Sequence, residues 1–149
     1  MFYYPLIYDI LIKMIILTQP HIKQALNRQS VKLAYLFGSV ARGEAHQESD
    51  VDIAILFDKS LNPKNYLLTE GRLIELFSPL FPGKEINLVN LNVSSPLLKQ
   101  NVILEGRLFF KANEIDRIMF EIKTLKLYEE YRHLNKIYQE VLKSKIEKL

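Results

Sequence analysis

Short apolar runs alternate along the chain with stretches in which apolar residues recur every three or four positions. Runs of the first kind are rich in β-branched and aromatic residues and predict buried strands at 31–37, 51–57 and 85–91. Stretches of the second kind predict helices at 20–29, from 62 towards 80 and from 94 to 106, each with a proline near its start. Strands that alternate with helices predict an α/β or α+β fold with a single layer of sheet.

The first 17 residues are unusually apolar. Pro5, Asp9 and Lys13 interrupt them, so the uninterrupted runs are far shorter than the ~20 residues that a membrane span needs. They also lack the basic start and the small-residue cleavage site of a signal peptide. We therefore expect no membrane partner, and a segment that either packs on the domain or extends ahead of a start at Met14. The alternative is an exposed apolar surface for a partner protein.

Residues 113–149 are predicted to form one or two long helices. Apolar residues, three tyrosines among them, fall at spacings of three or four from Ile118 to Leu142. Two interpretations stay open: the stripe packs on the core, or part of it faces another protein. We find no linker, so we expect one domain with three parts: the segment 1–17, a core at 18–112 and the helical segment 113–149.

Length and composition fit one globular domain, with 149 residues of which 48% are hydrophobic and 25% charged. The chain has no cysteine, which excludes a disulfide scaffold, a thiolate zinc site and a cysteine nucleophile. Its absence is also typical of the reducing cytoplasm, where we expect this protein. The formal net charge of +3 is too small to indicate nucleic-acid binding, so no direct DNA binding is expected.

Asp50 and Asp52 stand two positions apart at the start of the second predicted strand, so both carboxylates point to the same face. Two carboxylates so close together repel each other unless a cation joins them. Mg²⁺ is the usual cation, because it prefers carboxylate, water and phosphate oxygens. The apolar residues of the strand bury its other face, which makes the pair rigid. The pattern predicts a metal-binding, catalytic pair.

Gly38 and Ser39 follow the first predicted strand directly. A glycine at a strand end lets backbone N–H groups approach a phosphate closely, and the serine hydroxyl adds a donor. Arg42 is near enough in sequence to neutralise the same phosphates with its planar guanidinium. A triphosphate-binding turn beside a metal pair is what nucleotidyl transfer requires, since the metals activate the attacking oxygen and steady the leaving pyrophosphate. Taken alone, the glycine and serine would be an ordinary strand-end turn, the two aspartates could cap a loop, and the arginine would be a solvated side chain. The prediction therefore rests on their combination.

These residues also carry a family resemblance. The string LFGSVARGEAHQESDVDIAI resembles the minimal nucleotidyltransferase (MNT) group of the DNA polymerase β-like nucleotidyltransferase superfamily. Members of that group are small prokaryotic proteins paired with HEPN-domain ribonuclease toxins. The resemblance covers residues 20–110 or so and implies a nucleotidyltransferase fold, a small mixed sheet flanked by helices.

The resemblance further implies an antitoxin that moves AMP from ATP onto a tyrosine of a HEPN toxin and thereby silences its ribonuclease. It implies that Gly38 and Ser39 hold the triphosphate and that Asp50 and Asp52 bind one or two Mg²⁺ ions. Arg42 fits the pattern of the group, but its assignment to the nucleotide is our inference.

One position departs from the family's pattern. The family has a third carboxylate in its third strand, where this chain has Asn87. Asparagine can offer an oxygen to a metal, but it carries no charge and cannot act as a base. Glu85 lies two residues earlier on the same face, about 7 Å away by the rise of a strand, and is the candidate substitute. In the loop between the motifs, His46 is a candidate for substrate contact, whereas Glu44 and Glu48 are expected to be solvated.

Three functions therefore stay open. The first is the adenylyltransferase antitoxin with a HEPN toxin as partner. The second is an antitoxin that neutralises the toxin by direct binding without chemistry, an interpretation that Asn87 favours. The third is a small-molecule nucleotidyltransferase, for example one that acts on an aminoglycoside.

Overall fold

A single mixed sheet of four strands forms the centre of the molecule in the computed structural model, which describes residues 4–43 and 50–149. The strand order is β3-β2-β1-β4. Strand β1 pairs antiparallel with both β2 and β4, and β2 pairs parallel with β3. The strands span Val31–Phe37 (β1), Val51–Phe57 (β2), Ile86–Asn90 (β3) and Arg107–Lys111 (β4). The predicted fold class is confirmed.

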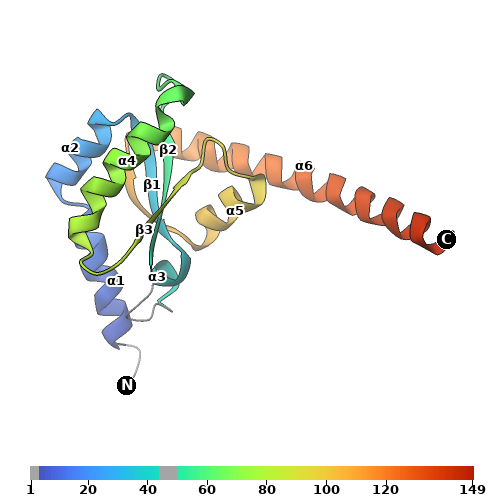
Figure 1. The fold of residues 1–149 in the computed structure, drawn as a ribbon, viewed down its shortest axis with the longest axis horizontal. Helices are drawn as coiled ribbons and strands as arrows, with labels where there is room; N and C mark the ends of the chain where they lie inside the picture. The colour runs from blue at the N-terminus through green and yellow to red at the C-terminus, as the bar shows by residue number, and fades with distance from the viewer. Residues whose placement is uncertain (1–3, 44–49) are drawn as a thin grey trace.

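Helices cover both faces of this sheet (Figure 1). One face packs against α1 (Tyr4–Leu17), α2 (Pro20–Arg28) and α4 (Tyr66–Phe77), the last flanked by 3-10 turns at Pro63–Asn65 and Ser78–Leu80. The other face packs against α5 (Pro96–Glu105) and the first half of α6 (Glu114–Glu147). The short helix α3 (Gly38–Arg42) follows β1 directly. No helix in the described part of the chain is both long and apolar enough to cross a membrane.

The alternation of strand β2 explains why both faces need cover. Val51, Ile53 and Ile55 point to the face of α1, α2 and α4 and are fully buried there. Ala54 and Leu56 point the other way, towards α5 and α6. Because side chains of a strand alternate between faces, a strand that is apolar on both must lie inside the sheet.

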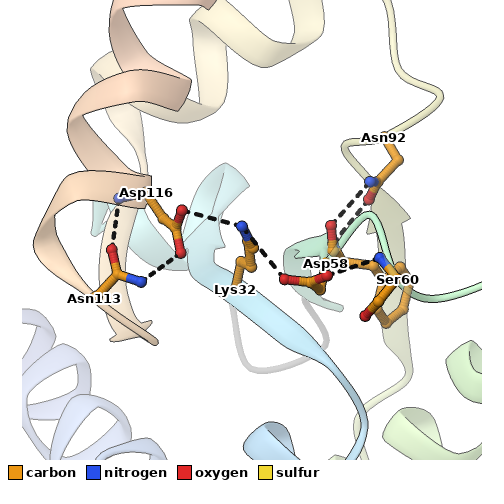
Figure 2. Close-up of polar contacts among 7 residues, drawn as sticks. Lys32, Asp58, Ser60, Asn92, Asn113 and Asp116 are labelled. Carbon is orange, nitrogen blue, oxygen red and sulfur yellow. Dashed lines mark hydrogen bonds and ion pairs between the residues drawn. The ribbon is translucent and has the colours of Figure 1, made fainter.

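A polar cluster fixes the start of α6 against the sheet, at the end where β1 begins and β2 finishes (Figure 2). The Lys32 ammonium lies 3.3 Å from an Asp58 oxygen and 3.0 Å from an Asp116 oxygen. The Asn113 side chain caps α6 by accepting the Asp116 backbone N–H at 2.8 Å. Asn92 bonds the backbone N–H and C=O of the last residue of β2. One lysine thus joins β1, the end of β2 and α6.

Strand β4 was not predicted. It follows Gly106 immediately, and a Cβ at that position would lie 2.3 Å from the Val102 carbonyl oxygen. Only a glycine therefore allows α5 to end and β4 to begin without an intervening loop. The pattern Arg-Leu-Phe-Phe-Lys is too short to identify as a strand until its pairing with β1 is seen.

The N-terminal segment forms helix α1, which both packs on the domain and exposes apolar surface. Ile10 and Leu17 are buried, and the Lys13 ammonium pairs with Asp9. The opposite side of α1 exposes five large apolar residues: Ile7, Tyr8, Leu11, Ile12 and Ile15.

The C-terminal segment is one continuous helix, α6, of 34 residues. The interpretation that its whole apolar stripe packs on the core is wrong. Ile118, Ile122 and Leu125 are 41%, 57% and 44% exposed, whereas the intervening Phe120 and Thr124 face the core. Spacing alone could not distinguish the two faces, because this part of α6 is apolar on both.

Candidate active site

Three strand ends meet at one edge of the sheet. Phe37, the last residue of β1, pairs with Asp52 across the antiparallel ladder. Asp52 pairs in turn with Asn87 across the parallel ladder to β3. The turn after β1 and the first residues of β2 and β3 are therefore neighbours, although as many as 35 residues separate Asp52 from Asn87 in the chain.

Gly38 lies in contact with the Asp52 carboxylate. Its backbone φ is +72°, a conformation that residues with a side chain rarely adopt. A Cβ at this position would lie 2.2 Å from Asp52 Oδ2. The glycine is thus required twice, once for the left-handed turn and once for the space that the carboxylate occupies.

Asn87 lies beside both predicted metal ligands. Its amide nitrogen is 3.2 Å from Asp52 Oδ1 and 3.4 Å from Asp50 Oδ2. The amide dipole partly offsets the repulsion between the two carboxylates. Asp50 is exposed and precedes β2, whereas Asp52 is half-buried within it. The spacing of the sequence thus correctly predicts that Asp50 and Asp52 share a face, and Asn87 is near enough to contact both.

Glu85, the other candidate for the third carboxylate, directly precedes β3. Its side chain is exposed and makes no hydrogen bond or ion pair with any residue that the structure describes. Its backbone carbonyl instead accepts the Val51 N–H at 2.9 Å, which extends the ladder between β2 and β3 by one bond. The candidates His46, Glu44 and Glu48 lie outside the described residues.

Ser39 and Arg42 lie on α3, at the same edge of the sheet as the carboxylates. Ser39 is half-buried in the first turn of this helix. The exposed Arg42 guanidinium lies 3.1 Å from Glu105 at the end of α5. Arg107, the first residue of β4, holds α3 in place by donating to the Ala41 carbonyl at 3.0 Å. Sequence reasoning missed Glu105, because no local pattern links residues 63 positions apart.

The donors gathered here fit a magnesium ion. No group of three or more His, Cys, Asp or Glu residues that could hold a metal ion gathers within residues 4–43 and 50–149. Mg²⁺ commonly binds through one or two carboxylates and completes its octahedron with water and substrate phosphates. Two aspartates side by side at an exposed strand end match the protein's share of that donor set.

The comparisons identify the class first. Residues 20–115 match the polymerase beta nucleotidyltransferase family, and the chain belongs to this family. Among individual relatives, the protein adenylyltransferase MntA of Shewanella oneidensis is 33% identical over 104 residues, which cover 69% of this chain and 70% of MntA. The predicted family is confirmed.

Solved structures agree with this assignment. A crystal structure of a toxin–antitoxin with AMP-PNP is 27% identical, has a TM-score of 0.59 and covers 81% of this chain and 92% of its own. A structure of a tri-AMPylated Shewanella oneidensis HEPN toxin in complex with an MNT antitoxin is 25% identical, with a TM-score of 0.56. It covers 86% of this chain and 95% of the matched one.

Proposed function

We propose that this protein is an MNT antitoxin that transfers AMP from ATP to a tyrosine of a HEPN ribonuclease toxin. The observation that carries the proposal is the fit of Gly38 against the Asp52 carboxylate, in a chain 33% identical to the adenylyltransferase MntA. A nucleotide-binding turn and a carboxylate pair at adjoining strand ends are the parts that this reaction needs. The solved complexes with AMP-PNP and with an AMPylated HEPN toxin support the nucleotide and the acceptor.

Each residue has a proposed role in this reaction. Asp50 and Asp52 hold Mg²⁺, with the Asn87 amide as a neutral neighbour. When bound, the ion supplies positive charge against the triphosphate and the attacking oxygen. Gly38 and Ser39 bind the triphosphate through the turn after β1. Arg42 neutralises phosphate charge from α3, a role in which it exchanges its exposed contact with Glu105 for the nucleotide.

The transfer itself exchanges one bond for another. The tyrosine Oη forms a bond to the α-phosphorus of ATP as the phosphoanhydride bond between the α- and β-phosphates breaks. AMP stays on the tyrosine, and pyrophosphate leaves. The phenol proton passes to solvent, because the site is exposed and Asn87 cannot accept it.

Transfer of labelled AMP from ATP onto the neighbouring HEPN protein, co-expressed with this chain, tests the proposal. With Mg²⁺ present, wild type should label the partner, and Asp50→Asn should abolish the label while leaving the thermal unfolding curve unchanged. Undiminished labelling by Asp50→Asn would refute the assignment of the site.

A second candidate function is neutralisation by binding alone, and Asn87 is the observation that favours it. A site with asparagine in place of the third carboxylate offers less negative charge to the metal. It also lacks the group that would accept the proton of the nucleophile. In that case wild type co-purifies with the HEPN protein without labelling it, and Asn87→Asp creates or raises transfer. Labelling by wild type, with little change in Asn87→Asp, excludes this candidate.

A further inference from the structure

Helix α6 leaves the body of the molecule and extends far beyond it (Figure 1). At 1.5 Å per residue its 34 residues measure about 50 Å. From residue 129 onward every side chain is exposed except that of Leu142, which is half-buried. The second half of α6 therefore contributes almost nothing to the packing of this domain.

The projecting half nevertheless keeps an apolar face, which we term the α6 seam: Leu127, Tyr131, Leu134, Tyr138 and Val141. These positions are spaced by four, three, four and three residues, the repeat by which one helix packs along another. The last four are 44%, 65%, 61% and 45% exposed. One to two turns earlier, the same face contains Phe120 and Thr124, which pack on the core. A face that is covered at its base thus continues uncovered for about 20 Å.

The base of the seam opens into a groove between α5, α6 and the end of β2, which we term the α5–α6 groove. Its volume is about 400 Å³. Apolar side chains that include Leu56, Phe120 and Leu127 line it, so the groove and the α6 seam form one continuous apolar surface.

Lysines outnumber acidic residues along the α5–α6 groove. Lys32 also lines the groove, but Asp58 and Asp116 neutralise it. In contrast, none of the other three lysines that line the groove forms an ion pair within residues 4–43 and 50–149: Lys59, Lys99 and Lys123.

Two of these lysines repel each other across the groove. Lys99 extends from α5 and Lys123 from α6. Burial, followed by the nearby charge of Lys123, lowers the pKa of the Lys99 ammonium. An acidic group placed between the two ammonium groups would remove this repulsion.

The geometry points to the α5–α6 groove and the α6 seam as the docking surface for an acidic amphipathic helix of the acceptor protein. Its apolar side lies along the seam, and its carboxylates lie between Lys99 and Lys123. The inference rests on the proposed function for the identity of that acceptor. The groove is at the opposite end of β2 from Asp52, roughly 17 Å away by the ~3.3 Å rise of a strand, so a docked helix leaves the active site open.

Charge reversal tests the electrostatic half of the inference. Binding of the neighbouring HEPN protein should weaken at least about 10-fold in the double variant Lys99→Glu/Lys123→Glu. The matched control, Lys136→Glu/Lys143→Glu, makes the same charge change on the opposite side of α6 by helical spacing and should bind within about 2-fold of wild type. Added salt should weaken the binding of wild type more than that of the first variant. Equal binding by the two double variants overturns the inference.

Substitution of exposed apolar residues by aspartate tests the apolar half of the inference without risk to the fold. Leu134→Asp changes a residue that is 65% exposed, so the domain should unfold as wild type does while the HEPN protein is bound at least about 10-fold more weakly. Ile122→Asp, at a residue 57% exposed on the other side of α6, is the control and should bind as wild type. If the chain alone self-associates and Leu134→Asp makes it monomeric, a second copy covers the seam and the inference is wrong.

Labelled AMP transfer, measured on the same samples, separates this inference from the proposed function. Binding that depends on Lys99, Lys123 and Leu134 without any transfer supports the surface and refutes the enzyme. Transfer and binding that are both indifferent to these residues support the enzyme and refute the surface.

Discussion

At residue 38 a single Cβ would disturb both the backbone and the carboxylate beside it. Gly38→Ala should lower the free energy of unfolding by about 2–3 kcal/mol, from backbone strain at φ +72° and from the clash with Asp52 Oδ2. It should also abolish AMP transfer, because Asp52 must move. Gly83 offers a matched control, since its φ is +76° but nothing lies within 4 Å of its Cβ position.

Chemical denaturation and the transfer assay together check this prediction. Gly83→Ala should lose only about 1 kcal/mol, the cost of the left-handed backbone, and keep full transfer. Equal losses of stability in the two variants would mean that the contact with Asp52 contributes nothing.

The residue at 87 determines how the site behaves without metal. Asn87→Asp should place three carboxylates together, since the Asn87 amide is within 3.4 Å of both aspartates. Like charges at directly paired positions of a sheet destabilise it, here by about 1 kcal/mol or a fall in Tm of about 2–4 °C. Added Mg²⁺ should reverse the fall and raise the Tm of Asn87→Asp more than that of wild type.

Thermal unfolding with Mg²⁺ and with chelator checks this prediction. Glu85→Gln serves as the control, because it removes a charge from the same end of the sheet without touching the aspartates, and its response to Mg²⁺ should equal that of wild type. A Tm of Asn87→Asp that ignores Mg²⁺ would contradict the assignment of the metal to this cluster.

The sequence allowed some positions in this site to be predicted, but not every contact between them. The two-residue spacing of Asp50 and Asp52 fixes their shared face, since a strand alternates strictly. The position of Asn87 follows from the resemblance, and the ladder between β2 and β3 confirms that it faces the pair. The contact of Arg42 with Glu105 could not be predicted, because it depends on where α5 ends in space.

At the level of elements, the Lys32 cluster determines how firmly α6 is attached to the sheet. Lys32→Met should lower the free energy of unfolding at pH 7 by about 1 kcal/mol, since it removes two partly exposed ion pairs and leaves their two carboxylates without a cation. Lys136→Met, on the projecting part of α6, is the control and should change stability little.

The stability that the Lys32 cluster contributes should depend on pH in a defined direction. Hydrogen bonds from Ser60, followed by the Lys32 ammonium, hold the pKa of the Asp58 carboxyl below its ordinary value of 3.8. Its contribution is therefore complete above pH 3.8 and lost as pH falls through the lower folded value. The carboxylates of Asp116 and Asp58 raise the pKa of Lys32 above 10.5, so its contribution is complete below that pH and lost above it. The difference in the free energy of unfolding between wild type and Lys32→Met, measured by chemical denaturation at a series of pH values, should therefore become smaller at both extremes of pH.

Elements were predictable where the pattern had one interpretation. Strands β1 and β2 are long apolar runs bounded by turns, and the structure gives them the predicted limits. Strand β4 has five residues at an edge and follows Gly106 without a loop, so only its partner β1 defines it. The periodicity of α6 correctly predicted a helix but left open which face packs on the core, because Ile118 and Phe120 are equally apolar.

At the scale of the whole molecule, the two terminal helices should differ in what they contribute to folding. Removal of residues 129–149 deletes side chains that are exposed, so the Tm should fall by no more than about 2 °C. Removal of residues 1–13 deletes the buried Ile10 from the core and should cost about 1.5–3 kcal/mol, or several degrees. Thermal unfolding of the two shortened chains beside wild type checks both values. If the loss of 129–149 lowers the Tm as much as the loss of 1–13, then α6 stabilises its own domain through contacts beyond those of its first half, and its apolar seam is not free for a partner.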